Sequence, residues 1–296
     1  MNNKPFKHIA LIGRPGKEIA DTLESVKNYL LSKNIEVSIE KNTTLMMEKN
    51  KLPHFSDHKI PDNIDLIIVV GGDGSLLNSV HLALPNNLPI LGINRGRLGF
   101  LTDIAPDELD KIGAVLLGDY ISESRNLITA DVIHSNNKKS HLGIALNDIV
   151  LLPGKLAQMI EFDIVIDNQF VCQQRADGLI VATPTGSTAY ALSGGGPILQ
   201  PQLNAMVLVP MFPHTLSARP IVVNGKSNIE LLISDHNETS PNISCDGQER
   251  VTVEAGDKII ISHCEKSLTL IHPTSYNYFA TLRGKLGWQS HTKRNS

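Results

Sequence analysis

Apolar runs alternate with amphipathic stretches over the first 125 residues of the chain. The runs at residues 8–12, 66–70 and 89–93 have no polar alternation, which is typical of parallel strands buried on both faces. Val37 and Ile39 alternate in a further strand, and the polar residues 41–63 are expected to form a long loop. Two stripes at helical spacing predict helices between the strands: Ile19, Leu23, Val26 and Leu30, and Leu109, Ile112, Val115 and Leu116. This order predicts a doubly wound, Rossmann-like α/β domain over residues 1–125.

Residues 126–273 show a different pattern, of short segments rich in Ile and Val separated by Asn, Asp, Gly or Pro. They predict an all-β, sandwich-like domain. The expected strands are 127–134, 142–151, 160–166, 178–182, 205–209, 221–223, 229–233, 258–262 and 268–272. Helical spacing returns at 276–288 with Tyr278, Phe279, Leu282 and Leu286, so residues 274–296 are expected to pack back on the first domain. The polar tail at 290–296 is expected to be disordered.

Composition narrows the class of protein. The 296 residues match two domains of roughly 150 residues. With 27 basic and 30 acidic residues, and only 4% aromatic residues, the chain has neither the charge nor the stacking side chains of a nucleic-acid binder. It lacks an apolar run of the roughly 20 residues that span a membrane, and it begins without a signal peptide. Cys172, Cys245 and Cys264 are isolated, as is usual for reduced cysteines in a cytoplasmic protein.

The strand at 66–70 leads directly into Gly71-Gly72-Asp73-Gly74, followed at Ser75 by an expected helix that carries Leu76, Leu77, Val80 and Leu84. A strand, a glycine turn and a helix N-terminus together favour phosphate binding, because backbone N–H groups can approach the ligand closely and positive φ is permitted. The carboxylate of Asp73 would repel phosphate, so its presence indicates chemistry or metal handling beside an anionic ligand. The alternative is an ordinary turn in which the aspartate caps a helix.

A second polar constellation follows the apolar strand at 178–182. Residues 183–197, Thr-Pro-Thr-Gly-Ser-Thr-Ala-Tyr and then Ser-Gly-Gly-Gly-Pro, are dense in hydroxyls and glycines suited to a phosphorylated or polyhydroxylated ligand. A surface loop is the alternative, which the stiffening by Pro184 and Pro197 disfavours. Asn147-Asp148 interrupts an apolar stretch, so one of the two side chains should point inward. A ligand ribose or a neighbouring loop would satisfy it.

Other motifs are absent or weak. The chain has no P-loop and no Gly-x-Ser-x-Gly elbow, which argues against P-loop enzymes and α/β hydrolases. Gly13-Arg14-Pro15-Gly16 lacks the spacing of a dinucleotide fingerprint. His54 and His58 lie in a polar loop with Pro53, which argues against a metal site there.

Taken together, the motifs resemble the NAD kinase family, in its bacterial, ATP-dependent type. The resemblance rests on Gly71-Gly72-Asp73-Gly74, on residues 92–101 (Gly-Ile-Asn-Arg-Gly-Arg-Leu-Gly-Phe-Leu), on Asn147-Asp148 and on Asp177-Gly178 through Thr183 to Tyr190, and it extends from residue 8 to Trp288. It implies transfer of the γ-phosphate of ATP to the 2′-hydroxyl of the adenosine ribose of NAD, a requirement for a divalent cation (normally Mg²⁺), a cytoplasmic location and a homo-oligomer, commonly a tetramer. Composition predicts no nucleic-acid or membrane partner.

The resemblance also assigns roles by position. Asp73 falls on the proton acceptor, and Gly71, Gly72 and Gly74 form the phosphate loop around it. The positions that fall on dinucleotide contacts are Asp73, Gly74, Asn147, Asp148, Gln158, Arg175, Asp177, Thr188, Ala189, Tyr190, Ala191, Leu192, Ser193 and Gln248. Gln158 stands where close relatives can carry His, and Asp148 where some carry Glu. The sequence has no evident acidic metal cluster, so the metal is expected to be bound through ATP oxygens.

Two other functions fit parts of the pattern. A lipid kinase of the diacylglycerol or sphingosine type would share the Gly-Gly-Asp-Gly loop, but the chain lacks an evident amphipathic membrane-binding helix. A catalytically silent NAD(P)-binding regulator would bind the dinucleotide without forming NADP, and the presence of Asp73 argues against it.

Overall fold

The computed structural model describes residues 6–14, 17–45, 47, 52–56, 59–95, 99–155, 158–248 and 250–288. Gly96, Arg97 and Leu98 of the family motif, His58 and the tail from residue 289 lie outside the described residues. The chain divides into two compact units. The first comprises residues 1–124 with the chain from Leu268 onward, and the second comprises residues 125–267.

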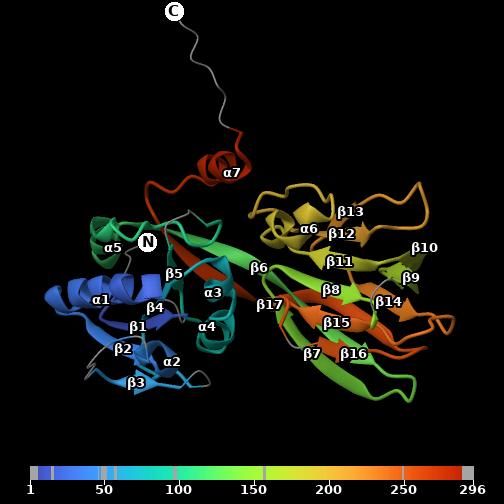
Figure 1. Cartoon of the computed structure of the whole chain (residues 1–296), viewed down its shortest axis with the longest axis horizontal. Coiled ribbons are helices and arrows are strands. Elements are labelled where there is room, and N and C mark those ends of the chain that lie inside the picture. Colours follow the sequence, from blue (N-terminus) through green and yellow to red (C-terminus); the bar gives the residue numbers. More distant parts are fainter. Residues whose placement is uncertain are drawn as a thin grey trace, which may run out of the picture. The chain divides into compact units, whose positions relative to one another are not determined.

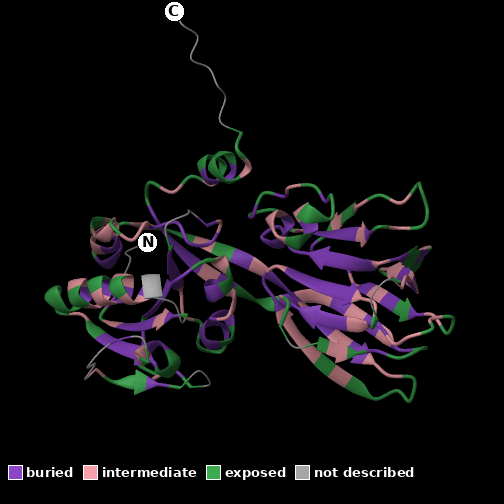
Figure 2. Cartoon of the chain, viewed as in Figure 1, coloured by how far each residue is buried: buried purple, intermediate pink, exposed green. Residues whose placement is uncertain are grey.

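The first unit is built on a parallel sheet with strand order β5-β4-β1-β2-β3 (Figure 1). Its strands are β1 (His8–Gly13), β2 (Glu36–Glu40), β3 (His54–Phe55), β4 (Leu66–Val70) and β5 (Ile90–Ile93). Its helices are α1 (Lys17–Ser32), α2 (Lys41–Thr44), α3 (Asp73–Leu77), α4 (Val80–Asn86) and α5 (Leu109–Leu116). All five residues of β4 are buried, as its unbroken apolar run predicts (Figure 2). The predicted α/β architecture is confirmed.

The predicted stripes account for how the helices pack. Ile19, Leu23, Val26 and Leu30 of α1 and Ile112, Val115 and Leu116 of α5 belong to the same buried apolar cluster as β4. The prediction of a loop over residues 41–63 was wrong, because α2 and β3 lie within it. Glu40 caps α2, and its carboxylate accepts hydrogen bonds from the N–H groups of Asn42 and Thr43, each at 2.9 Å. Glutamate is not among the residues usually found at helix caps, so composition did not reveal this start.

The second unit is a sandwich of two antiparallel sheets that share one core. One set of strands belongs to the same sheet as β1–β5 and consists of β6 (Tyr120–Ile133), β7 (Lys139–Ala145), β9 (Ile160–Ile166), β10 (Gln169–Ala176), β14 (Ile229–Ile233) and β17 (Lys258–Pro273). The other contains β8 (Asp148–Leu152), β11 (Gly178–Ala182), β12 (Ala205–Met211), β13 (Ile221–Asn224), β15 (Asn242–Cys245) and β16 (Arg250–Thr252). Phe162 and Leu231 from the first sheet and Leu151, Val181 and Ile243 from the second lie in one buried cluster. The β-rich character predicted for this part is confirmed.

Several strand boundaries differ from the prediction. Residues 142–151 form two strands, β7 and β8, because the chain leaves the sheet at Leu146-Asn147. The segments 258–262 and 268–272 are one strand, β17, which pairs with β14 at its start and with β5 at Leu270 and Ile271. No strand was predicted at β10, β15 or β16: β10 is rich in glutamine and mostly exposed, and β15 and β16 are only four and three residues long.

The last helix, α7 (Tyr278–Leu286), belongs to the first unit. Asn277 caps its start by accepting the N–H of Ala280 at 2.9 Å, and Gly287 ends it with a φ of 67°. Of the predicted stripe, Leu282 is buried, but Phe279 is 54% exposed, so the apolar spacing was only partly a packing face. Within the described residues, no helix combines the length and apolar character needed to cross a membrane.

Candidate functional site

Asp73 is the first residue of α3 and lies directly after β4 and its two glycines. Its carboxylate is held by three successive residues of another segment. Oδ2 accepts the N–H of Phe100 at 2.9 Å, and Oδ1 accepts the N–H of Leu101 at 3.0 Å and the hydroxyl of Thr102 at 3.3 Å. Gly99 permits this approach, because a Cβ there would lie 2.1 Å from Oδ1 of Asp73. The carboxylate is therefore fixed in orientation, and the interpretation of Asp73 as a mere helix cap does not account for these bonds.

The three glycines around Asp73 differ in their surroundings. Gly71 is needed for packing, because a Cβ there would lie 2.3 Å from Oγ of Ser75. Gly72 and Gly74 are exposed and have no atom within 4 Å of a built Cβ, so their missing side chains leave open space. None of the three has a positive φ, so the conformational freedom anticipated for them is not used here. The helix begins at Asp73 rather than at Ser75 and is interrupted before Val80, which corrects the predicted bounds.

In the second unit, Asn147 immediately precedes β8 and Asp148 begins it, and hydrogen bonds hold this backbone from two sides. Thr183 donates its hydroxyl to the carbonyl of Leu146 at 2.5 Å and its N–H to the carbonyl of Asn147 at 2.9 Å. On the other side, Asp246 accepts the N–H groups of Leu146, Asn147 and Asp148 at 2.8, 2.8 and 3.1 Å. The two polar side chains thus project from a rigid backbone.

The side chains of Asp148, which is buried, and Asp246, which is partly buried, form a pair of neighbouring carboxyl groups. Burial, with a smaller repulsion from Asp246, raises the pKa of Asp148 to about 7. Burial also raises the pKa of Asp246, while the hydrogen bonds from Leu146, Asp148 and Asn147 act to lower it. Burial raises the pKa of the neighbouring Cys245 thiol to about 12, so this cysteine stays protonated at neutral pH. Asp148 therefore changes its charge near neutrality, which is characteristic of functional groups.

A pocket of about 380 Å³ lies over this pair. Four of its lining residues were predicted as dinucleotide contacts: Asn147, Asp148, Ala189 and Tyr190. The others were not predicted. The lining consists of Asn147, Asp148, Val150, Leu152, Ala189, Tyr190, Ser244, Asp246, Gly247 and Arg250. This volume and the mixture of apolar walls with a few convergent polar groups suit a small-molecule ligand.

The other predicted contacts occupy different surroundings. Gln158 and Arg175 line a separate polar pocket of about 390 Å³ with Glu161 and His236. There the amide of Gln158 donates to Glu238 at 3.3 Å and accepts the hydroxyl of Thr239 at 2.7 Å. Asp177 begins the turn into β11, and its N–H donates to the carbonyl of Met211 at 2.9 Å.

The loop expected to wrap the ligand forms a 3₁₀ turn (Gly186–Thr188) and the short helix α6 (Tyr190–Ser193). Tyr190 is 43% exposed, whereas Ala191 is fully buried against β11 and β12 and offers no exposed atom to a ligand. Leu192 is partly buried, Ser193 lines a further pocket beside Tyr190, and Thr188 donates its hydroxyl to the carbonyl of Thr185. Gln248 is exposed and its N–H closes the turn onto the carbonyl of Cys245.

Sequence reasoning missed Asp246, Arg250, Gly99 and Thr102. Asp246-Gly247 was detectable, because Asp-Gly between short apolar segments is a hairpin-turn signal, and both residues have positive φ, 49° and 67°. Gly99 lay within the quoted family stretch, but only the fold shows that it faces Asp73. Arg250 carried no signal of its own.

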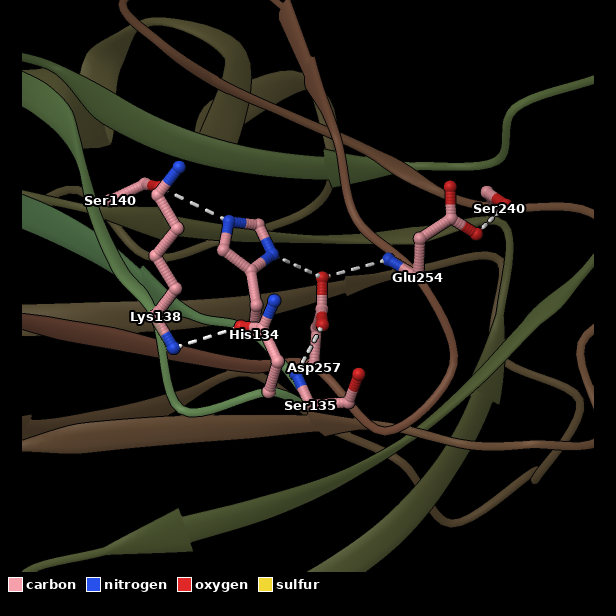
Figure 3. Close-up of polar contacts among 8 residues, drawn as sticks. His134, Ser135, Lys138, Ser140, Ser240, Glu254 and Asp257 are labelled. Carbon is pink, nitrogen blue, oxygen red and sulfur yellow. Dashed lines mark hydrogen bonds and ion pairs between the residues drawn. The ribbon is translucent and has the colours of Figure 1, made fainter.

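A polar cluster elsewhere in the second unit superficially resembles a hydrolase triad (Figure 3). His134 contacts Asp257 through Nδ1 at 3.0 Å and Ser140 through Nε2 at 3.1 Å. Asp257 also accepts the N–H groups of Ser135 and Glu254, each at 3.0 Å. These bonds tie the β6–β7 turn to the turn before β17, so the cluster is explained as a structural connection.

Metal ligands do not gather in the described part of the chain: no three His, Cys, Asp or Glu side chains there are arranged to hold an ion. The oxygens of Asp73 already accept three hydrogen bonds, which fits a positioned carboxylate better than a metal ligand.

Comparisons with known proteins place the chain in a family. The model of the ATP-NAD kinase N-terminal domain matches residues 9–120, and that of the ATP-NAD kinase C-terminal domain matches residues 146–273. The NAD kinase of Coxiella burnetii (strain RSA 493 / Nine Mile phase I) is 56% identical over 97% of this chain and 96% of its own length. The NAD kinase of Marinobacter nauticus is 52% identical over 96% of this chain and 97% of its own.

Solved structures agree with this placement. An NAD kinase from Archaeoglobus fulgidus in complex with ATP has a TM-score of 0.71 at 28% identity, covering 94% of this chain and 99% of that one. Yeast NADH kinase complexed with NADH has a TM-score of 0.84 at 23% identity, covering 99% and 91%, which shows the shared fold.

Proposed function

Since the chain belongs to the ATP-NAD kinase family, we propose that its reaction is carried by Asp73 in the first unit and by the Asn147–Asp148 pocket in the second. As an ATP-dependent NAD kinase, it transfers the γ-phosphate of ATP to the 2′-hydroxyl of the adenosine ribose of NAD and yields NADP and ADP. The observation that carries the assignment of Asp73 is its carboxylate, fixed by three donors from Phe100, Leu101 and Thr102.

Asp73 acts as the proton acceptor. As the 2′-oxygen forms its bond to the γ-phosphorus and the bond to ADP breaks, the hydroxyl proton passes to the carboxylate. A carboxylate is a weak base for an alcohol, and phosphoryl transfer has a loose transition state, so the proton moves late and most of the rate comes from in-line positioning. The three hydrogen bonds hold the carboxylate in one orientation, which supports its role in this positioning.

The dinucleotide is held by the other predicted positions. Asn147 and Asp148 offer an amide and a carboxyl group from a fixed backbone to ribose hydroxyls, and Tyr190 provides an aromatic wall in the same pocket. Arg175 and Gln158, in their own polar pocket, serve another part of the dinucleotide, together with Asp177, Gln248 and the loop Thr188–Ser193. The open space at Gly72 and Gly74 accommodates the phosphates.

A divalent cation, Mg²⁺ by family resemblance, would be held mainly by the oxygens of ATP and would neutralise their charge. The location in the cytoplasm and the assembly into a homo-oligomer, with a tetramer as the expected order, rest on the same resemblance.

The test is NADP formation from NAD, ATP and Mg²⁺ by the wild type and by Asp73→Asn. We expect the variant to bind NAD with near-normal affinity, measured by calorimetry, and to lose about 10²–10⁴-fold in kcat, the usual contribution of general acid–base catalysis. Thr102→Val is the comparison variant: it removes one donor to Asp73 and leaves the carboxylate in place, so its kcat should fall less than that of Asp73→Asn. A near-normal kcat in Asp73→Asn would refute the assignment. Phosphorylation of a lipid emulsion instead of NAD would identify a lipid kinase, and NAD binding without turnover in the wild type would identify a silent regulator.

A further inference from the structure

Asp246 lines the pocket beside Asp148, is partly buried, and has no ligand contact assigned to it. It lies in the turn between β15 and β16, and its two oxygens accept three consecutive backbone N–H groups, those of Leu146, Asn147 and Asp148, over 2.8–3.1 Å. Its own N–H donates to the carbonyl of Asp148 at 2.9 Å. The four bonds join the turn to the part of the chain where β7 has ended and β8 begins.

The opposite side of the same backbone is equally constrained. Thr183 bonds the carbonyls of Leu146 and Asn147, and its hydroxyl also accepts the N–H of Gly186 at 3.1 Å. A Cβ at Gly186 would lie 2.1 Å from the carbonyl oxygen of Asn147, so this turn is packed directly against the peptide. With both its N–H and C=O groups bound, the peptide at Asn147 has one orientation, and so do the side chains that flank it.

We propose that Asp246 is a positioning residue for the dinucleotide, which clamps the backbone of Leu146–Asp148 and places its own negative charge beside Asp148. This inference rests on the proposed function of Asn147 and Asp148 as ribose contacts. Asp246 acts through them: it orients the amide of Asn147, and its charge favours the protonated form of Asp148.

The second part of this role makes binding depend on pH. The thiol of Cys245 and the carboxylate of Asp246 lie near Asp148, and the other titratable residues that line the pocket with it are Tyr190 and Arg250. Burial and Asp246 both raise the pKa of Asp148, to about 7. An ionised Asp148 accepts a hydrogen bond from a ribose hydroxyl more strongly than a protonated one. The KM for NAD is therefore expected to rise as the pH falls below about 7.

The experiment compares Asp246→Asn with the wild type, in full-length enzyme, over pH 5.5–8.5 (about the range in which Asp148 titrates). An asparagine has to present an N–H₂ to one of the backbone N–H groups, so the clamp is broken and the charge is removed. We expect the KM for NAD to rise about 10-fold at pH 8 while kcat changes less than about threefold. We also expect the inflection of KM against pH to move to lower pH, because Asp148 loses its negative neighbour.

Asp257→Asn is the matched control. Asp257 also accepts two backbone N–H groups and one side chain, in the same unit, within the cluster of His134 (Figure 3). This variant should lower the melting temperature as much as Asp246→Asn and leave both the KM for NAD and its pH profile unchanged. An unchanged KM and pH profile in Asp246→Asn, or equal changes in both variants, would overturn the proposal.

Two further outcomes, a variant that does not fold and a wild type that forms no NADP, can each be distinguished from failure of the proposal. If Asp246→Asn does not fold, Thr183→Val tests the clamp from the carbonyl side, because it removes the hydroxyl that binds Leu146, and the same rise in KM is expected with no shift of the inflection. An unchanged KM in Thr183→Val would then count against the clamp. If the wild type forms no NADP, the proposed function fails, and NAD affinity measured by calorimetry still decides whether Asp246 positions the pocket.

Discussion

Gly99→Ala tests whether the catalytic power of the first unit depends on how the carboxylate of Asp73 is held. A methyl group at position 99 would lie 2.1 Å from Oδ1 of Asp73, 2.4 Å from Oγ1 of Thr102 and 3.0 Å from Cγ of Asp73. Non-bonded heavy atoms repel one another at separations much below roughly 3.5 Å, so the carboxylate or the segment facing it has to move by about 1 Å. The substitution leaves every reacting group in the protein and changes only its position.

The expected magnitudes follow from this displacement. A shift of about 1 Å in a positioned group costs on the order of 10²-fold in rate, so kcat should fall by roughly that factor. Hydrogen bonds to a charged group contribute about 1.5–3 kcal/mol each, and loss of one of the three should lower the free energy of unfolding by about 2 kcal/mol. Binding of NAD involves mainly the second unit in our proposal, so its Kd should change little.

The assay is NADP formation at saturating NAD and ATP, with urea unfolding measured on the same samples. Gly284→Ala is the control for the glycine-to-alanine change, because a Cβ at this helical position in α7 has no atom within 4 Å. It should keep kcat and stabilise the protein by up to about 1 kcal/mol, the difference in helix propensity. If folded Gly99→Ala retains the kcat of the wild type, the positioning of Asp73 by residues 100–102 is not what limits turnover.

Two more predictions concern the glycine loop and the carboxyl pair. Gly71→Ala should destabilise the protein by about 1–3 kcal/mol in urea unfolding, because its Cβ would lie 2.3 Å from Oγ of Ser75. Gly72→Ala should keep the stability of the wild type, because a Cβ there has no atom within 4 Å. It should raise the KM for ATP if the open space at Gly72 holds phosphates. For the pair, the pKa of Asp148 is raised to about 7, so the folded state binds more protons than the unfolded state between pH 4 and pH 7. The free energy of unfolding should therefore fall as the pH rises through this range, and urea midpoints of Asp148→Asn should fall less steeply. Equal slopes for the two proteins would contradict the raised pKa.

Much of the fold was predictable because burial leaves a clear signature in the sequence. The unbroken apolar run of β4 and the helical stripe of α1 each have one stable arrangement, buried between layers. The failures are short or polar elements whose stability comes from distant partners. α2 depends on its cap by Glu40, and β10 is a polar strand that pairs with β9 across a register shift, so neither shows an apolar period.

The candidate site was predictable in its side chains and not in its supports. Asp73, Asn147 and Asp148 are polar residues in apolar surroundings, which is visible in the sequence. Asp246 and Thr102 act on them through contacts between residues 29 to 100 positions apart, and a single sequence has no signal for such pairs. The raised pKa of Asp148 is likewise a consequence of burial beside a second carboxyl group, which only the fold brings about.

The two units use the same structural device in opposite senses. In each, one carboxylate accepts hydrogen bonds from three consecutive residues of a separate segment: Asp73 from residues 100–102, and Asp246 from residues 146–148. In the first unit the segment orients the carboxylate, which then acts on the substrate. In the second unit the carboxylate orients the segment, whose side chains then bind the substrate.

In this proposal the chemical step depends on Asp73 and substrate binding depends on Asp246. Asp73→Asn should therefore lower kcat with little change in NAD affinity, and Asp246→Asn should raise KM with little change in kcat. The same Asp-to-Asn substitution, breaking the same kind of bond, would thus give two separable kinetic defects. If both variants lowered kcat alone, Asp246 would belong with the chemistry, and this division of roles would be wrong.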